Sequence, residues 1–260
     1  MSKYLEIINT PMRAMNMNIT AADYHNVKIE ESGEPLVKLE MRPGIKFFDQ
    51  SRLPKGPRTN GFYLRKTAAE KLYAAGAYLF DLTNGELELY VRDGYRLIEM
   101  QRQDWAEGVR NLTAELGNFH AAQDAAKVLY SDPTGFDEND PSTWAHHTPS
   151  HTTGGAVDVF IIANRAMNVG DWLYMDRPPH RHPDRIGHYE TRYFEGRTGL
   201  SEIEQMVMKN RRLLVHVMEA NGFYNYPREA WHFDYGDQMA RFTAGSSEPA
   251  IYGYIKRPKE

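Results

Sequence analysis

The sequence contains no cysteine among its 260 residues. Disulfide bonds, thiolate metal sites and cysteine nucleophiles are therefore excluded, and any metal site has to use histidine and carboxylate side chains. No stretch approaches the roughly 20 apolar residues of a membrane-spanning helix. The first residues also hold no apolar run typical of a signal peptide. These last two absences predict a soluble, cytoplasmic protein with no membrane partner.

An excess of basic residues is missing as well, because the formal net charge is −4. Binding to a phosphate backbone requires a basic stripe, so we do not expect a nucleic-acid partner. With 41% hydrophobic and 25% charged residues, the composition is that of an ordinary globular protein. The length suffices to bury a sizeable core.

The hydrophobic pattern contains both helical and strand periodicities. Helices are expected over 66–80, 97–116 and 201–220. The first and third of these helices begin at the capping-box patterns Thr67 to Glu70 and Ser201 to Glu204. Strands are expected over 37–41, 87–91, 156–162 and 231–235. Without repeats or low-complexity linkers, the pattern predicts a single α+β domain over 1–260, with a mainly antiparallel sheet flanked by helices.

Two short motifs far apart in the sequence provide a set of metal ligands. His151 lies where a loop enters a predicted strand, and Gly154 permits a tight turn that brings this histidine back over Asp158. The second motif contains Glu229 and His232. Two imidazoles and one carboxylate are typical ligands of a catalytic zinc, which keeps its fourth position for water. The remaining glutamate is a candidate acceptor for a proton of that water.

Each of these residues also has an ordinary explanation. A single histidine at a strand end is usually a polar side chain with a satisfied hydrogen bond, and Glu-x-x-His alone is a weak motif. The spacing between Glu229 and His232 does not place both on one face of a regular strand. Both can face one site only if the strand begins irregularly. The spacing alone therefore leaves the zinc site and the ordinary explanation open.

Taken together, the two motifs resemble a known family signature. The pattern His-x-x-Gly-x-Ala-x-Asp at 151–158, followed by Glu-x-Trp-His at 229–232, is similar to that of the D-alanyl-D-alanine dipeptidase (VanX-type) zinc peptidases. These are related to D,D-carboxypeptidases and to hedgehog-like zinc domains. The segments 63–70 and 90–96 resemble the family's helix and its Asp-x-Tyr-Arg strand end. The similarity runs over about 61–236 and leaves 1–60 as a divergent N-terminal segment.

The resemblance implies one zinc ion per chain, in a central cleft. Its ligands would be His151, Asp158 and His232. Glu229 would be the general base, and Arg96 would stabilise the oxyanion that develops on the scissile carbonyl. Without the resemblance, Arg96 would be interpreted as a surface arginine paired with Asp93.

The specificity elements depart from the family pattern. Pro149 stands where the family has a serine two positions before the first zinc histidine, and the neighbouring Ser150 is the candidate substitute. Leu97 follows the arginine where proline is typical. Met41 and Arg42 stand near the place of an N-terminal tyrosine that holds the ammonium group of the substrate.

A second ammonium-binding element of the family, a Gly-Thr-Pro-Phe-Asp stretch, is replaced here by residues 169–176. Asp171 and Asp176 are the candidate anchors for a substrate ammonium in this stretch, because an anion binds a cation well in a closed site. The sequence does not distinguish between them.

The predicted function is zinc-dependent hydrolysis of a short peptide, foremost a dipeptide of the D-Ala-D-Ala type, by attack of zinc-bound water. The divergent specificity elements leave open whether D-Ala-D-Ala itself is the substrate. One alternative, a peptidoglycan D,D-carboxypeptidase or endopeptidase, is disfavoured by the missing signal segment. Another, a non-catalytic zinc-binding module, is disfavoured by the presence of Glu229 and Arg96. The oligomeric state is not indicated.

Overall fold

A computed structural model describes residues 2–13, 19, 21–52, 56–164, 173 and 197–256. Its α-helices are α1 (Lys3–Asn9), α2 (Ala21–Tyr24), α3 (Lys66–Leu82), α4 (Ile98–Leu116), α5 (Phe119–Leu129), α6 (Trp144–His147), α8 (Glu202–Glu219) and α9 (Gln238–Thr243). Short 3-10 helices are η1 (Gln50–Arg52), η2 (Pro141–Thr143) and η3 (Ser150–Thr153). The strands are β1 (Leu36–Lys38), β2 (Ile45–Phe47), β3 (Tyr63–Arg65), β4 (Leu87–Asp93), β5 (Ala156–Ala163), β6 (Tyr224–Asn225) and β7 (His232–Asp234).

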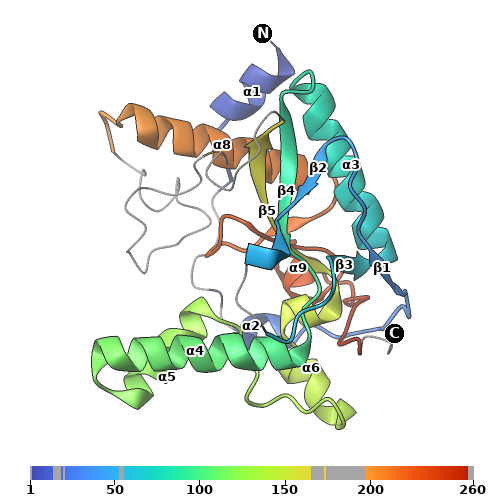
Figure 1. The fold of residues 1–260 in the computed structure, drawn as a ribbon, viewed down its shortest axis with the longest axis vertical. Coiled ribbons are helices and arrows are strands. Elements are labelled where there is room, and N and C mark those ends of the chain that lie inside the picture. Colours follow the sequence, from blue (N-terminus) through green and yellow to red (C-terminus); the bar gives the residue numbers. More distant parts are fainter. Residues whose placement is uncertain are drawn as a thin grey trace.

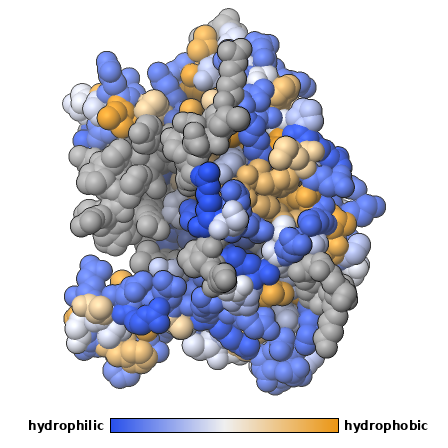
Figure 2. Space-filling view, in the orientation of Figure 1, coloured by the Kyte–Doolittle hydropathy of each residue, from blue (hydrophilic) through white to orange (hydrophobic). Residues whose placement is uncertain are grey.

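The main sheet has five strands in the order β2-β4-β5-β7-β6 (Figure 1). Strand β2 runs parallel to β4, and all other neighbours are antiparallel. Helices α3 and α8 pack against this sheet, and α1 packs on α8. The pair α4 and α5 lies beyond one end of the sheet and forms a separate lobe of mixed hydropathy in the space-filling view (Figure 2). The fold is therefore α+β with a mainly antiparallel sheet, as the sequence predicts.

The main hydrophobic core lies between the sheet and helices α3 and α8. Its fully buried members include Leu72, Leu79, Leu89, Ile161, Leu214 and Val217. These residues come from the predicted helices and strands, whose apolar positions point inward at helical or alternating spacing. Strand β5 is buried over nearly its whole length, because it lies in the middle of the sheet. Packing in this core fixes the positions of strands β5 and β7, whose ends carry the candidate ligands Asp158 and His232.

The strand register brings three polar residues into one row. Asp93 at the end of β4 is paired with Asp158 of β5, after a register shift that follows Val91. Asp158 is in turn paired with His232 at the start of β7. Cross-strand partners have their side chains close together on the same face. One end of the sheet therefore presents Asp93, Asp158 and His232 side by side.

One of the two predicted capping boxes forms and the other does not. Ser201 forms the predicted capping box with Glu204. The box at Thr67 does not form, because α3 begins at Lys66 and its N-cap is Arg65, two positions before Thr67. The amide and hydroxyl of Thr67 bind the carboxylate of Glu34 instead. A partner distant in sequence thus replaces the local cap.

Helix α5 and the short helices η2 and α6 are elements that the sequence analysis did not predict. Among the described helices, none combines the length and the apolar character needed to span a bilayer. The single domain over 1–260, the central cleft and the cytoplasmic location remain predictions.

Candidate metal centre and active site

The three predicted ligands converge at one end of the sheet. His151 is held in η3, while Asp158 and His232 come from the paired strands β5 and β7. One ligand atom from each lies within 4.8 Å of the others, and all three residues are buried. Gly154 ends η3 with a φ of 76°, a backbone conformation that favours glycine. The tight turn predicted after His151 is therefore present.

The ring of His151 has one defined orientation. Its Nδ1 lies 2.7 Å from the carbonyl oxygen of Gly94. Because a carbonyl only accepts, Nδ1 carries the hydrogen of the neutral ring and donates it. Nε2, which lies 3.3 Å from Oδ1 of Asp158, then keeps its lone pair. His151 could therefore bind a metal through Nε2.

His232 presents its other nitrogen to the cluster. Its Nδ1 lies 3.1 Å from Oδ1 of Asp158, whereas its Nε2 lies 3.0 Å from Oδ1 of Asp234. Burial opposes charging of this ring, but Asp234 and Asp158 raise the pKa of His232 well above its usual value. The cluster thus attracts positive charge. Two imidazole nitrogens and one carboxylate oxygen are also the ligands that suit a zinc ion with an open position.

Glu229 lies beside these ligands. Its Oε2 is 3.6 Å from Nδ1 of His232, and its side chain is 27% exposed. The chain turns between them, with the amide of His232 donating to the carbonyl of Glu229 at 3.3 Å and β7 beginning only at His232. The irregular strand start that the spacing requires is therefore present. Burial, with a further contribution from Asp158, raises the pKa of Glu229 to about 7, although His232 and Arg96 oppose this shift.

Arg96 joins two carboxylates at the edge of the cluster. Its Nε donates to Asp93 at 2.8 Å and its Nη2 to Asp158 at 2.9 Å. Its Nη1 donates to Gln101 at 3.1 Å. Burial opposes the charged form, but Asp93 and Asp158 raise the pKa of the guanidinium. The pairing with Asp93 that the ordinary explanation requires is real, and the same side chain also contacts a candidate metal ligand.

Sequence reasoning missed three polar residues around this site. Gln101 and Asp104 lie one turn apart near the start of α4, and both face Arg96. Oδ2 of Asp104 is 4.0 Å from Nη1 of Arg96, and its side chain is 32% exposed. Asp234 follows His232 by two positions on the same strand, so that both point to one face. That alternation is the signal that could have identified Asp234.

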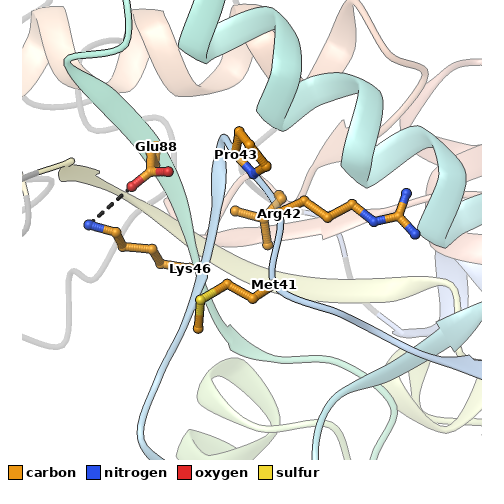
Figure 3. A pocket seen from close by; sticks show the side chains of 6 residues that line it. Met41, Arg42, Pro43, Lys46 and Glu88 are labelled. Carbon is orange, nitrogen blue, oxygen red and sulfur yellow. Dashed lines mark ion pairs between the residues drawn. The ribbon is translucent and has the colours of Figure 1, made fainter.

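The residues proposed to determine specificity lie in different parts of the structure, and two of them lie outside the described residues. Oγ of Ser150 lies 3.4 Å from Nε2 of His232, so this residue is at the site. Asp171 and Asp176 lie outside the described residues. Met41 and Arg42 line a pocket with Lys46 and Glu88 (Figure 3).

That pocket lies far from the candidate site. Glu88 is near the start of β4, whereas Asp93 is at its other end. At about 3.3 Å per residue, the two ends of β4 are too far apart for one dipeptide to contact both. Arg42 also stacks on Tyr73 of α3, 3.9 Å from the ring centroid. Met41 and Arg42 therefore do not take the place of an ammonium-binding tyrosine.

Comparisons with known proteins agree with the motifs. Residues 197–248 match the Peptidase M15 family, described as D-ala-D-ala dipeptidase. The D-alanyl-D-alanine dipeptidase of Synechocystis sp. is 25% identical over 257 residues, which cover 93% of this chain and 100% of the relative. The resemblance to the dipeptidase family is thereby confirmed.

Two solved structures are also similar. One is a mutant of the vancomycin resistance D,D-pentapeptidase VanY from a VanB-type cassette, in complex with Zn(II). It is 17% identical with a TM-score of 0.39, over 81% of this chain and 93% of that chain. The other is the LD-carboxypeptidase LdcB, 18% identical with a TM-score of 0.38, over 85% of this chain and 77% of that chain.

Proposed function

We propose that this chain, a zinc peptidase related to the D-alanyl-D-alanine dipeptidases, hydrolyses a dipeptide of the D-Ala-D-Ala type at the site around Asp158. The observation that carries this proposal is that Glu229 and Arg96 both flank the same three buried ligand residues. A zinc site that only stabilises a fold needs neither a free glutamate nor an arginine at its edge. The non-catalytic alternative is therefore disfavoured.

One zinc ion would be held by Nε2 of His151, Nδ1 of His232 and a carboxylate oxygen of Asp158. Bound zinc lowers the pKa of its water from about 15.7 to about 7. Oε2 of Glu229 is the proton acceptor in this proposal, because it lies 3.6 Å from Nδ1 of His232, on the side of the ring where the zinc and its water would be held. The same carboxyl group then returns the proton to the leaving amine.

Arg96 would donate to the oxygen on which negative charge develops. Its hydrogen bonds to Asp93 and Asp158 fix the guanidinium plane, so little reorganisation is needed when that charge forms. Such a preorganised donor contributes most where water is excluded. Ser150 is the candidate for a further polar contact with substrate because of its place next to the first ligand in the sequence, although its hydroxyl lies on the Nε2 side of the His232 ring, opposite the proposed metal position.

The substrate class is proposed from the relatives. The curated relative is named a D-alanyl-D-alanine dipeptidase, and the matching family is described in the same terms. The departures at Pro149 and Leu97 concern specificity rather than the ligands and the base. We therefore expect dipeptide cleavage, with a preference among dipeptides that differs from that of D-Ala-D-Ala specialists.

Hydrolysis of D-Ala-D-Ala and a panel of other dipeptides by the zinc-loaded protein tests this proposal. The variant Glu229→Ala should keep its zinc but lose at least a hundredfold in kcat, because general acid–base catalysis contributes roughly a hundredfold to ten-thousandfold. Full activity of Glu229→Ala would contradict the mechanism. A protein that holds one zinc and cleaves no dipeptide would contradict the substrate class, and cleavage of longer peptidoglycan peptides would then support the carboxypeptidase alternative.

A further inference from the structure

The two candidate histidine ligands have chemically different partners behind them. Nδ1 of His151 donates to a neutral backbone carbonyl, that of Gly94, at 2.7 Å. Nε2 of His232 faces a carboxylate oxygen of Asp234 at 3.0 Å. A carboxylate behind a metal-binding imidazole fixes the ring tautomer and raises the basicity of the nitrogen that binds the metal. The two ligands should therefore differ in strength.

Asp234 is itself held rigidly. Its side chain is fully buried, and its backbone is paired on both sides, with Ala156 of β5 and with Tyr224 of β6. Because it lies two positions after His232 on one strand, the strand geometry alone points its carboxylate at the imidazole. The other polar neighbour of Nε2, the hydroxyl of Ser150, is more distant at 3.4 Å and uncharged. The carboxylate is therefore the dominant partner of this nitrogen.

We propose that Asp234 is a positioning residue that holds His232 with Nε2 protonated and Nδ1 turned toward the metal. Asp158 and Glu229 lie on the Nδ1 side of the ring, at 3.1 and 3.6 Å. If the ring were flipped, its protonated nitrogen would face those two residues and the metal position, and no lone pair would be available there. This inference rests on the metal-binding part of the proposed function and not on turnover.

The test is zinc affinity, measured by competition with a chromophoric chelator on the full chain. Asp234→Asn keeps the shape and an acceptor oxygen but removes the charge. We expect it to bind zinc roughly tenfold to a hundredfold more weakly than the wild-type protein, the usual effect of removing such a partner. Glu88→Gln is the matched control, because Glu88 is also buried in the same sheet but pairs with Lys46 at the other end of β4 (Figure 3). Its zinc affinity should equal that of the wild type.

The electronic spectrum of the cobalt-substituted proteins separates positioning from a loss of fold. Asp234→Asn should retain a four-coordinate spectrum with shifted bands, whereas Glu88→Gln should match the wild type. Zinc affinity and a cobalt spectrum of Asp234→Asn that are both indistinguishable from wild type would overturn the proposal. Neither readout depends on hydrolysis, so inactivity toward every dipeptide would contradict the proposed function and leave this inference intact.

A second measurement needs no variant. Nitrogen-15 NMR of the histidine rings in the zinc-loaded wild-type protein distinguishes a metal-bound nitrogen from a protonated one. For His232 we expect a metal-bound Nδ1 and a protonated Nε2 that exchanges slowly with water. A metal-bound Nε2 in His232 would contradict the proposal, even if Asp234→Asn failed to fold.

Discussion

Two arginines, one buried and one partly buried, contact the segment that carries His151 in different ways: the side chain of Arg65 donates to the carbonyl of Thr153, and the backbone amide of Arg96 donates to that of His151. Arg65 has a side chain that is 2% exposed, and most of its partners are backbone carbonyls. Arg96 has a side chain that is 20% exposed, and its side-chain partners are Asp93, Asp158 and Gln101. The same residue type therefore serves two purposes, and the nature of the partners distinguishes them.

Arg65 connects parts of the chain that are far apart in sequence. It donates to the carbonyls of Glu34, Thr153 and Gly253 and pairs with Glu31 at 3.0 Å. Backbone carbonyls cannot change charge and do not participate in the proposed chemistry. These contacts hold η3 against the N-terminal and C-terminal segments. Arg65 therefore contributes to stability, whereas Arg96 belongs to the candidate site.

The largest expected effect follows from the loss of Arg65. Arg65→Ala removes the donor to two buried carbonyls, those of Thr153 and Gly253, and leaving each of them unsatisfied costs about 1–3 kcal/mol, or about 2–6 kcal/mol for both. We expect the free energy of unfolding to fall by about that amount in urea titrations of the metal-free protein. Arg52→Ala is the control, because Arg52 pairs with Asp49 in solvent, with a side chain 51% exposed, and exposed pairs contribute about 0–1 kcal/mol. Equal stabilities for the two variants would contradict the comparison.

Substitution of Arg96 tests the other half of the comparison, and the quantity measured is kcat. Arg96→Ala removes a donor proposed to stabilise the oxyanion, and the loss of one such donor typically lowers kcat by roughly a hundredfold to a thousandfold. Steady-state kinetics of the zinc-loaded variant on the best dipeptide substrate measures this. The folded fraction of Arg65→Ala should retain near wild-type kcat. A variant of Arg96 with unchanged kcat would mean that both arginines are structural.

The features of the fold and the candidate site that depend on local sequence pattern can be predicted from the sequence. Helices with regular apolar spacing, such as α3 and α4, begin and end within two residues of the prediction. The three candidate ligands follow from two short motifs, and the second of these motifs lies within the residues that match the family model. The irregular start of β7 could be inferred because Glu229 and His232 cannot both face one site otherwise.

What could not be predicted depends on pairings between distant segments. The partners of Arg65 come from three separate regions, and no local spacing reveals them. Thr67 has the right local pattern for a cap, yet it binds Glu34 because tertiary contacts override local preference. The register that aligns Asp93 with Asp158 depends on an irregularity after Val91. Contacts of this kind can be identified only once the three-dimensional structure is known.

The smallest expected effect on stability concerns a buried carboxyl group, that of Asp237. Asp237 is almost fully buried at the N-cap of α9. Burial and the neighbouring Asp234 carboxylate raise the pKa of Asp237 well above its usual value, although a hydrogen bond from the amide of Ala240 opposes this. Because the folded-state pKa exceeds the unfolded one, folding favours the protonated acid. Its contribution to stability is complete below the unfolded pKa of about 3.9 and is lost as the pH rises toward the folded pKa.

Asp237→Asn should therefore stabilise the metal-free protein at neutral pH, by on the order of 1 kcal/mol, because the amide carries no charge that has to be buried. Asparagine caps helices about as well as aspartate, so the hydrogen bond to the amide of Ala240 is retained. Urea unfolding at pH 4 and pH 7 should show a gain that grows with pH. Asp140 is the matched N-cap control at η2, because hydrogen bonds from Ser142 lower its pKa and its contribution is present at neutral pH. Asp140→Asn should therefore change stability in the opposite direction as the pH rises, and a gain with the same sign in both variants would show that charge burial does not govern Asp237.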